Sequence, residues 1–521
     1  MKSSAYRRWW YLVALFTLVS SLLAACGGSS NQGGAATSAP AGGGAATSAP
    51  AGGAEATAAT GGGAAATTAP EATAATEGGA AATSAPEATS AAGGGTTGGA
   101  TAGQGPKLNA DVSGSIEMWH FWSSPLRRTA IRRVISLCQS MLPNIKVNET
   151  PKPFGDIWTA NIAAVAAGSG MPDVIVEDRP QLVKRAADQI DIDLSEYATR
   201  DGIDGSAFWP FTWKEATVDG KPYGIPFETD VRVLYWNKQA FKEAGLDPEK
   251  PPKTWDDLWA YADKLDKKND DGSYARIAFQ PDFGNAGWNL WARTNGAEFL
   301  QNGKLSVNDP KVVETMEWIK KWYDRYGGYD AVKKFQGTFG APPNDAFMSG
   351  KVAMIADING YSSVLNFYNP KVEVKTADGK TEQQPLDVGV GDLPYSASYG
   401  KPSSTSGGFA LSIPRGSPNA DAAWEFIKCA TGPQGAASWS RDTSAMAANV
   451  AAAHDPALMG DPRWQFFLKA MDYSHGADVV PKYPNWGTEV DQRRESIFKG
   501  QKDAKAALDE AQQVIDAQVG G

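Results

Sequence analysis

The sequence has little histidine and cysteine, and it lacks the short motifs that usually mark catalysis. Its 521 residues include three histidines, His120, His454 and His475, which stand far apart and lie beside no nucleophile motif. Zinc sites place their ligands at short, regular spacings, and nucleotide hydrolysis uses a glycine-rich phosphate loop. Neither pattern occurs, so we expect no catalytic residue, no metal and no cofactor. Acidic residues are abundant, however, and a carboxylate pair that hydrolyses glycosides stays an alternative.

Basic residues are outnumbered by acidic ones, and this balance bears on the possible partners. The formal net charge is −9, and loss of the first 25 residues removes three basic groups and no acid, giving −9 − 3 = −12. A surface of this sign repels the phosphates of nucleic acids and anionic lipid headgroups. We therefore expect no nucleic-acid partner.

Residues 1–25 have the pattern of an export signal. Lys2, Arg7 and Arg8 precede an apolar run that starts at Trp9 and ends in LLAAC at Cys26. A membrane-spanning helix is the alternative, but the run contains hydroxyl residues and meets a Gly/Ser tract in place of a basic stop signal. The pattern resembles a bacterial lipoprotein signal, which implies cleavage before Cys26 and acyl chains on that residue. We expect a chain anchored to the outer face of the cell membrane, or a periplasmic one.

Large apolar residues are nearly absent from residues 27–105. This stretch consists mainly of Ala, Gly, Thr, Ser and Pro, and ATSAP recurs in it. Such a segment buries too little surface to fold, so residues 26–107 are predicted to be a flexible tether that follows the lipid-bearing cysteine. Glycosylation of its hydroxyl groups stays open.

Two cysteines lie beyond the tether, Cys138 and Cys429. In an exported protein they can form a disulfide. Cys138 also falls on an apolar stripe at helical spacing with Ile131, Val134 and Leu142, which is typical of a buried free thiol. Both alternatives stay open from the sequence.

Residues 108–521 alternate between strand and helix patterns. Ser115–Trp122 and Ile145–Glu149 read as strands around a helix at Arg127–Leu142, and a second helix at Ile157–Ala167 precedes an apolar strand at Asp173–Val176. This order predicts a parallel α/β sheet. The 414 residues exceed one ordinary core and indicate two lobes.

Four separated segments resemble one known family. They are GKPYGIPFETDVRVLYWNKQAFKEAG with PPKTWDDLWAYADKL, AFMSGKVAMIADINGY, SGGFALSIPRGSPNADAAWEFIKCATGPQGAASWS, and PNWGTEVDQRRESIFKGQKDAKAALDEAQQVI. Together with PDVIVEDR they are similar to the maltose-binding-protein-like solute-binding proteins of carbohydrate ABC importers. The resemblance implies the type II fold, with two α/β lobes, hinge crossings and a ligand cleft between the lobes.

The resemblance also implies where the chain crosses between lobes. Crossings are expected at Glu228–Val231, near Val388–Leu393 and around Gly435–Arg441. Lobe one then comprises 108–228 plus 390–434, and lobe two comprises 229–389 plus 435–521.

Candidate ligand contacts combine carboxylates with aromatic rings, because a sugar offers hydroxyl groups and stacking faces. Asp178 and Arg179 follow a strand whose carboxyl end is expected at the cleft, with a surface ion pair as the alternative. Asp230 stands six residues before Trp236 of the YWNK motif, where a carboxylate accepts hydroxyl hydrogen bonds; a hinge cap is the other interpretation.

The remaining candidates are stacking rings and close-approach glycines. Tyr361 ends ADINGY and Trp486 lies in PNWGT, where the family places aromatic platforms, and Trp122 lies at the exit of the first strand. Gly407 and Gly408 are expected to let backbone amides approach a ligand, with a plain turn as the alternative.

These observations predict a monomeric, non-enzymatic protein that captures a carbohydrate by cleft closure. Its expected partner is the permease of an ABC transporter, and it meets the membrane through its lipid alone. The alternatives are an exported carbohydrate-active hydrolase, or a binding protein for a polyamine, a peptide or glycerol phosphate. An acidic cleft with few stacked rings favours a polyamine, and a basic one favours phosphate.

Overall fold

The structure is a computed structural model that describes residues 105–375 and 380–520. Within these ranges no helix is long and apolar enough to cross a membrane. The signal segment, Cys26 and the tether up to residue 104 lie outside the described residues and stay predictions.

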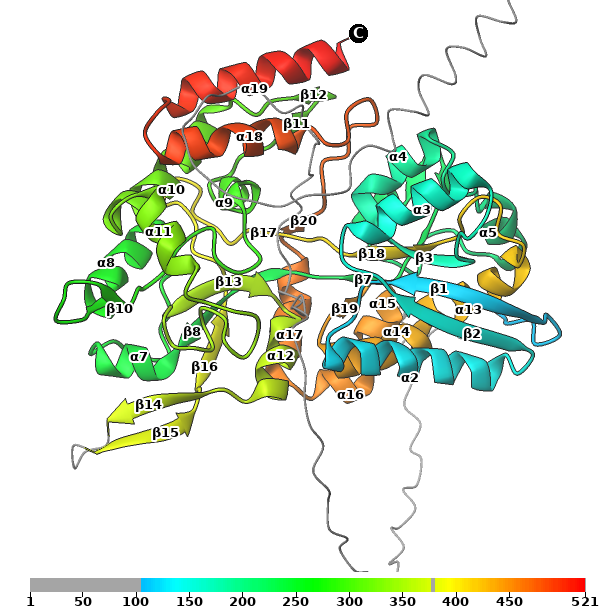
Figure 1. Ribbon diagram of the computed structural model, residues 1–521, viewed down its shortest axis with the longest axis horizontal. Coiled ribbons are helices and arrows are strands. Elements are labelled where there is room, and N and C mark those ends of the chain that lie inside the picture. The colour runs from blue at the N-terminus through cyan, green and yellow to red at the C-terminus, as the bar shows by residue number, and fades with distance from the viewer. Residues whose placement is uncertain (1–104, 376–379, 521) are drawn as a thin grey trace, which may run out of the picture. The chain divides into compact units, whose positions relative to one another are not determined.

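Five strands form the first sheet, in the order β2-β1-β3-β18-β6 (Figure 1). Their bounds are β1 Gly114–His120, β2 Ile145–Pro151, β3 Val174–Asp178, β6 Ile225–Pro226 and β18 Phe409–Ser412. β1 pairs in parallel with β2 and β3, as the sequence pattern predicts, and β18 runs antiparallel to β3. Parallel strands end at one edge, and Phe409 pairs with Asp178, so the start of β18 lies at this carboxyl edge too.

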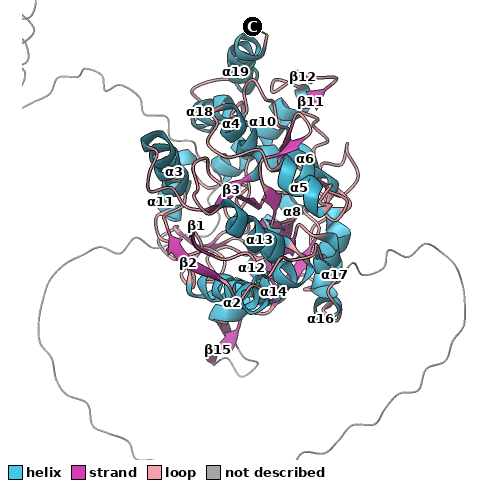
Figure 2. Cartoon of the chain, turned by 90° about the vertical axis from the view of Figure 1, so that its right-hand side faces the viewer, coloured by secondary structure: helices cyan, strands magenta, loops and turns pink. Residues whose placement is uncertain are grey.

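Helices α2 (Pro125–Met141) and α13 (Ala420–Thr431) cover this sheet (Figures 1 and 2). Cys138 of α2 and Cys429 of α13 form a disulfide with their Cα atoms 5.8 Å apart. Both cysteines are buried. The disulfide is therefore the alternative that the structure supports, and it joins the two helices across 291 residues of sequence.

The second sheet has the order β13-β8-β16, with β8 at Arg232–Asn237, β13 at Met354–Ile358 and β16 at Val388–Gly391. Beside it lie α8 (Trp255–Leu265) and α10 (Pro310–Arg325), whose Trp255 and Trp318 rings stack at 4.2 Å. Thr254 and Asp257 form a capping box at the start of α8. Trp255 and Trp318 are core residues.

The other elements, several of them two-residue strands, complete the described chain. They are η1 Arg179–Gln181, α3 Asp156–Ala167, α4 Leu182–Ala187, α5 Ser195–Asp201, α6 Pro210–Glu215, β4 Thr217–Val218, β5 Lys221–Pro222, β7 Glu228–Thr229, α7 Lys238–Glu243, β9 Lys267–Lys268, β10 Tyr274–Arg276, α9 Trp288–Thr294, β11 Leu300–Gln301, β12 Lys304–Leu305, α11 Tyr329–Gln336, α12 Tyr361–Tyr368, β14 Lys371–Lys375, β15 Thr381–Pro385, β17 Ser404–Thr405, α14 Pro433–Thr443, β19 Met446–Ala447, α15 Val450–Ala453, α16 Pro456–Met459, α17 Pro462–Met471, β20 Ser474–His475, α18 Gly487–Phe498 and α19 Ala504–Val519.

Buried apolar side chains form one large cluster around each sheet. The chain passes from the first to the second through β7 and β8, close to the predicted Glu228–Val231 crossing. The expected crossing near Val388–Leu393 needs correction, because Val388–Gly391 pairs with β8 inside the second sheet. The chain returns to the first sheet only between β17 and β18, so residues 390–403 lie with the second sheet.

Candidate functional site

Two glycines occupy the return crossing between β17 and β18. Gly408 has φ +121°, and a Cβ built on it would lie 2.3 Å from the Glu228 carbonyl oxygen and 2.8 Å from the Cα of Thr229. The close backbone approach and the positive φ therefore require glycine here. Gly407 is less constrained, since a Cβ there would first meet the Arg232 guanidinium, at 3.1 Å.

Arg179 forms hydrogen bonds to both segments that cross between the sheets. Its Nε donates to Glu215 Oε2 at 2.9 Å, and its terminal nitrogens donate to the backbone carbonyls of Glu228 and Gly407. The side chain has no exposed surface. The predicted ligand contact by Arg179 therefore needs correction. Its guanidinium forms hydrogen bonds to the two crossing segments, and none of its surface is open to a ligand.

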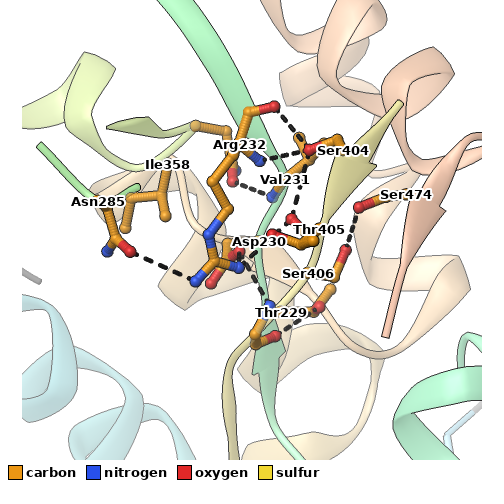
Figure 3. Close-up of polar contacts among 12 residues, drawn as sticks. Thr229, Asp230, Val231, Arg232, Asn285, Ile358, Ser404, Thr405, Ser406 and Ser474 are labelled. Carbon is orange, nitrogen blue, oxygen red and sulfur yellow. Dashed lines mark hydrogen bonds and ion pairs between the residues drawn. The ribbon is translucent and has the colours of Figure 1, made fainter. Parts of the chain in front are cut away.

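Asp230 and Arg232 form a polar cluster beside these glycines (Figure 3). Asp230 Oδ1 accepts from the Gly407 N–H at 3.1 Å and from the Arg232 guanidinium. Arg232 also donates to Asn285 Oδ1 at 3.4 Å, and its backbone N–H donates to Ser404 Oγ. Both charged side chains stay partly exposed, Asp230 at 14% and Arg232 at 12%, so this cluster offers fixed donors and acceptors to a ligand.

An aromatic cluster lies at the carboxyl edge of the first sheet, next to the same crossing. Phe409, which follows Gly408, packs on Phe121 with ring centroids 4.7 Å apart. Phe154 contacts both Phe121 and Trp158 edge-on, at 5.0 Å in each case. Phe121 follows the end of β1, Phe154 lies three residues after the end of β2, and Phe409 begins β18. Trp158 comes from the first turn of α3.

Two buried carboxyl groups, one from each sheet, have raised pKa values. Asp178 is the last residue of β3, and burial raises its pKa to about 6. Asp357 of β13 belongs to the second sheet, and burial raises its pKa to about 7. The positive charge of Arg179, and to a smaller extent that of Arg232, partly offsets the rise in the pKa of Asp178. The charge of Arg232 also partly offsets the rise in the pKa of Asp357.

A pocket of about 460 Å³ opens beside the crossing. Its walls come from residues 211–219 and 474–481, and they include Glu215, which accepts the Ala477 N–H at 2.7 Å. Arg293, also in its wall, is paired with Glu298 and Asp478. A second hollow of about 260 Å³ lies among α12, β16 and Arg463. Lys214 and Asp219 line the larger pocket.

Three predicted aromatic contacts are core residues in this structure. Trp122 is fully buried and packs on Trp439 at 4.5 Å. Trp486 is 8% exposed, its indole N–H donates to the Asp478 carbonyl at 2.8 Å, and it packs on Phe299. Tyr361 is 7% exposed and donates to Asp345 Oδ2 at 2.9 Å. Packing and internal hydrogen bonds occupy these rings, so they do not offer open stacking faces here.

The structure therefore gathers Asp178, Asp230, Gly407 and Gly408 around one crossing and adds residues that sequence reasoning missed. The missed residues are Arg232, Asn285, Asp357, Phe121, Phe154, Trp158 and Phe409. A usable signal was the position of Phe121 at the end of the predicted strand Ser115–Trp122. Among the residues that the structure describes, no group of three or more His, Cys, Asp or Glu side chains is arranged to hold a metal ion.

The fold and this crossing are those of a two-lobed binding protein, and the sequence comparison gives the family. The model of the bacterial extracellular solute-binding proteins matches residues 136–465, more than half of the chain, so the chain belongs to this family. The family resemblance and the type II α/β fold class predicted from the sequence are thereby confirmed. Membership also agrees with the predicted location outside the cytoplasm.

Curated relatives include the sn-glycerol-3-phosphate-binding periplasmic protein UgpB of Yersinia pseudotuberculosis, 26% identical over 319 residues, and its counterpart in Escherichia coli K12, 26% identical over 314 residues. The matches cover 56% and 55% of this chain. The chain spans 65% and 64% of those relatives' lengths, just under two thirds.

Solved structures similar to this chain extend over most of its described part. CpMnBP1 with mannotriose bound is 27% identical, with a TM-score of 0.67, and covers 77% of this chain and 99% of its own. UgpB from Mycobacterium tuberculosis in complex with glycerophosphocholine is 19% identical, with a TM-score of 0.61, and covers 78% of this chain and 98% of its own. The second likeness concerns the fold alone.

Proposed function

We propose that this chain captures a neutral carbohydrate outside the cytoplasm and delivers it to the permease of an ABC transporter. The observation that carries the proposal is the juxtaposition, at one sheet edge, of the aromatic cluster with the Asp230–Arg232 cluster. Aromatic faces bind the C–H faces of a sugar, and charge-assisted acceptors bind its hydroxyl groups. Ligand binding then favours closure of the two lobes by its differential affinity for the closed state.

The charges of the site favour a neutral ligand over glycerol phosphate. Arg179 is paired with Glu215 and Arg232 with Asp230. Asp178 and Asp357 add two carboxyl groups with raised pKa values, and Arg127, whose charge acts on Glu228, adds one cation. A phosphate that binds Arg179 or Arg232 would have to displace the carboxylate paired with it. The displaced carboxylate would then stay buried without a partner, which is unfavourable. The several rings at the edge also favour a sugar over a polyamine.

Binding without chemistry is the proposed activity, and membership of a family of binding proteins supports it. The lipid on Cys26 is a second, separate proposal that rests on the signal pattern. Cell fractionation of Cys26→Ser tests it: the variant should leave the membrane or stay uncleaved. Unchanged, detergent-requiring attachment of that variant would refute the anchor.

Thermal unfolding in the presence of a ligand panel tests the proposed function. The panel contains mannose, mannobiose, mannotriose, maltotriose, sn-glycerol 3-phosphate and spermidine. A sugar at 100 times its Kd should stabilise the protein by about 2.7 kcal/mol, because it binds only the native state. Asp230→Asn, which keeps the side-chain size, should reduce that shift. Stabilisation by sn-glycerol 3-phosphate or spermidine and by none of the sugars would reject the carbohydrate proposal.

A further inference from the structure

Phe154 is exposed although it belongs to the aromatic cluster at the ligand edge. Its side chain is 44% exposed, and only Ile162 and Phe367 are comparable among the large apolar residues that the structure describes. Exposed rings cost free energy in water, whereas Phe121 and Phe409 of the same cluster are more deeply buried. The solvent-facing surface of Phe154 is therefore available to a ligand that enters at this edge.

Local structure fixes the position of this ring. β2 ends at Pro151, and Gly155, with φ +88°, turns the chain into α3 directly after Phe154. Ile157 then anchors the start of α3 in the core. Trp158 is held against β3, because its indole N–H donates to the Val176 carbonyl at 3.0 Å. Phe154 meets fixed partners on two sides, and its orientation is set before any ligand arrives.

The surroundings of Phe154 suit a neutral ring. Asp156 lies two residues after Phe154 and Lys152 two residues before it, with the Lys152 ammonium 3.8 Å from the centroid of the Trp119 ring. One acid and one cation thus flank Phe154, and its exposed ring can gain stacking area from a sugar ring without loss of either charge. Trp158 is half-buried beside Phe154 and widens the same apolar surface.

We infer that Phe154 and Trp158 form an outer subsite for a sugar ring, beyond the ring that the Asp230–Arg232 cluster binds. The ligand is then an oligosaccharide of two or more rings. This inference rests on the proposed carbohydrate function. It adds the number of sugar rings in the ligand and names Phe154 as the residue that contacts the second ring. In this proposal Phe154 is a specificity-determining residue, because it contacts the second ring of the ligand and not the first.

Titration calorimetry with two sugar series tests the subsite: mannose, mannobiose and mannotriose, and glucose, maltose and maltotriose. In the wild-type protein the two- and three-ring sugars of the preferred series should bind more tightly than the monosaccharide. Phe154→Leu keeps apolar bulk but removes the ring, and it should weaken binding of the longer sugars roughly tenfold while changing the monosaccharide by less than about twofold. Phe154→Tyr should retain wild-type affinity.

Phe367→Leu is the matched control, because Phe367 is 49% exposed on α12 and lies outside the aromatic cluster. It should leave every affinity unchanged. Equal loss for one-ring and three-ring sugars in Phe154→Leu would make Phe154 a structural residue and overturn the subsite, and so would no loss at all. Tight binding of the monosaccharide alone by the wild type would also overturn it. Failure of the wild type to bind either series would instead reject the carbohydrate function itself.

Discussion

Replacement of Arg179 by methionine should lower the free energy of unfolding by about 3–5 kcal/mol and weaken sugar binding. The substitution leaves Glu215, which is 4% exposed, without its cation, and it removes the donors to the Glu228 and Gly407 carbonyls. Those carbonyls belong to the two crossing segments, so their positions should become less defined. Denaturant unfolding and calorimetric titration of the variant measure the two effects.

Arg200→Met is the matched control, because the Arg200 side chain is 53% exposed and pairs with Asp201 at the surface. Arg200→Met should lower the free energy of unfolding by less than about 1 kcal/mol. The double variant Arg179→Met/Glu215→Met should recover part of the stability, since it removes the stranded carboxylate as well. A loss below about 1 kcal/mol in Arg179→Met would show that the buried network contributes little.

Wild-type stability should fall as pH rises from about 4.5 to about 7 relative to Glu177→Gln, by about 3 kcal/mol at most. Glu177 is fully buried beneath α4, and burial raises its pKa from 4.5 to about 7, partly offset by Arg185. In this pH window the native state holds a proton that the unfolded state has released. The stabilisation is therefore complete below about pH 4.5 and lost above about pH 7.

Asp191 lies in the same buried cluster as Glu177 and should make the fall in wild-type stability with pH steeper. Neither of its carboxylate oxygens has a hydrogen-bond partner, and burial together with Glu177 raises its pKa. Asp188→Asn is the control, since Asp188 is exposed and pairs with Lys184. Denaturant unfolding of the two variants and the wild type across this pH range measures the effect. Parallel curves for the wild type and Glu177→Gln would contradict the assignment.

Local sequence patterns were sufficient for the architecture. The spacing of apolar residues in β1, α2 and β2 predicts the parallel sheet, because this signal acts within a few residues. The family resemblance placed Asp178, Asp230, Gly407 and Gly408 at the ligand cleft, and the structure brings these four residues together around one crossing. These positions depend on strand order, which the sequence preserves.

Side-chain burial was harder to predict, because it depends on packing between distant segments. Trp122 and Trp486 were expected as stacking platforms, but Trp439 and Phe299 cover them from elsewhere in the chain. Arg179 follows a strand end, and nothing local indicates that Glu215 and two backbone carbonyls surround it. Conversely, Phe154 stands in a loop with no periodic pattern, and only the fold brings it to Phe121 and Trp158.

Calorimetric titration with mannotriose and maltotriose on one side, and sn-glycerol 3-phosphate on the other, tests the central claim most directly. The paired arginines and the aromatic edge predict saturable binding of at least one oligosaccharide by the wild type, with roughly tenfold weaker binding by Asp230→Asn. They predict no measurable heat with sn-glycerol 3-phosphate. Tight binding of sn-glycerol 3-phosphate, with neither oligosaccharide bound, would contradict the account.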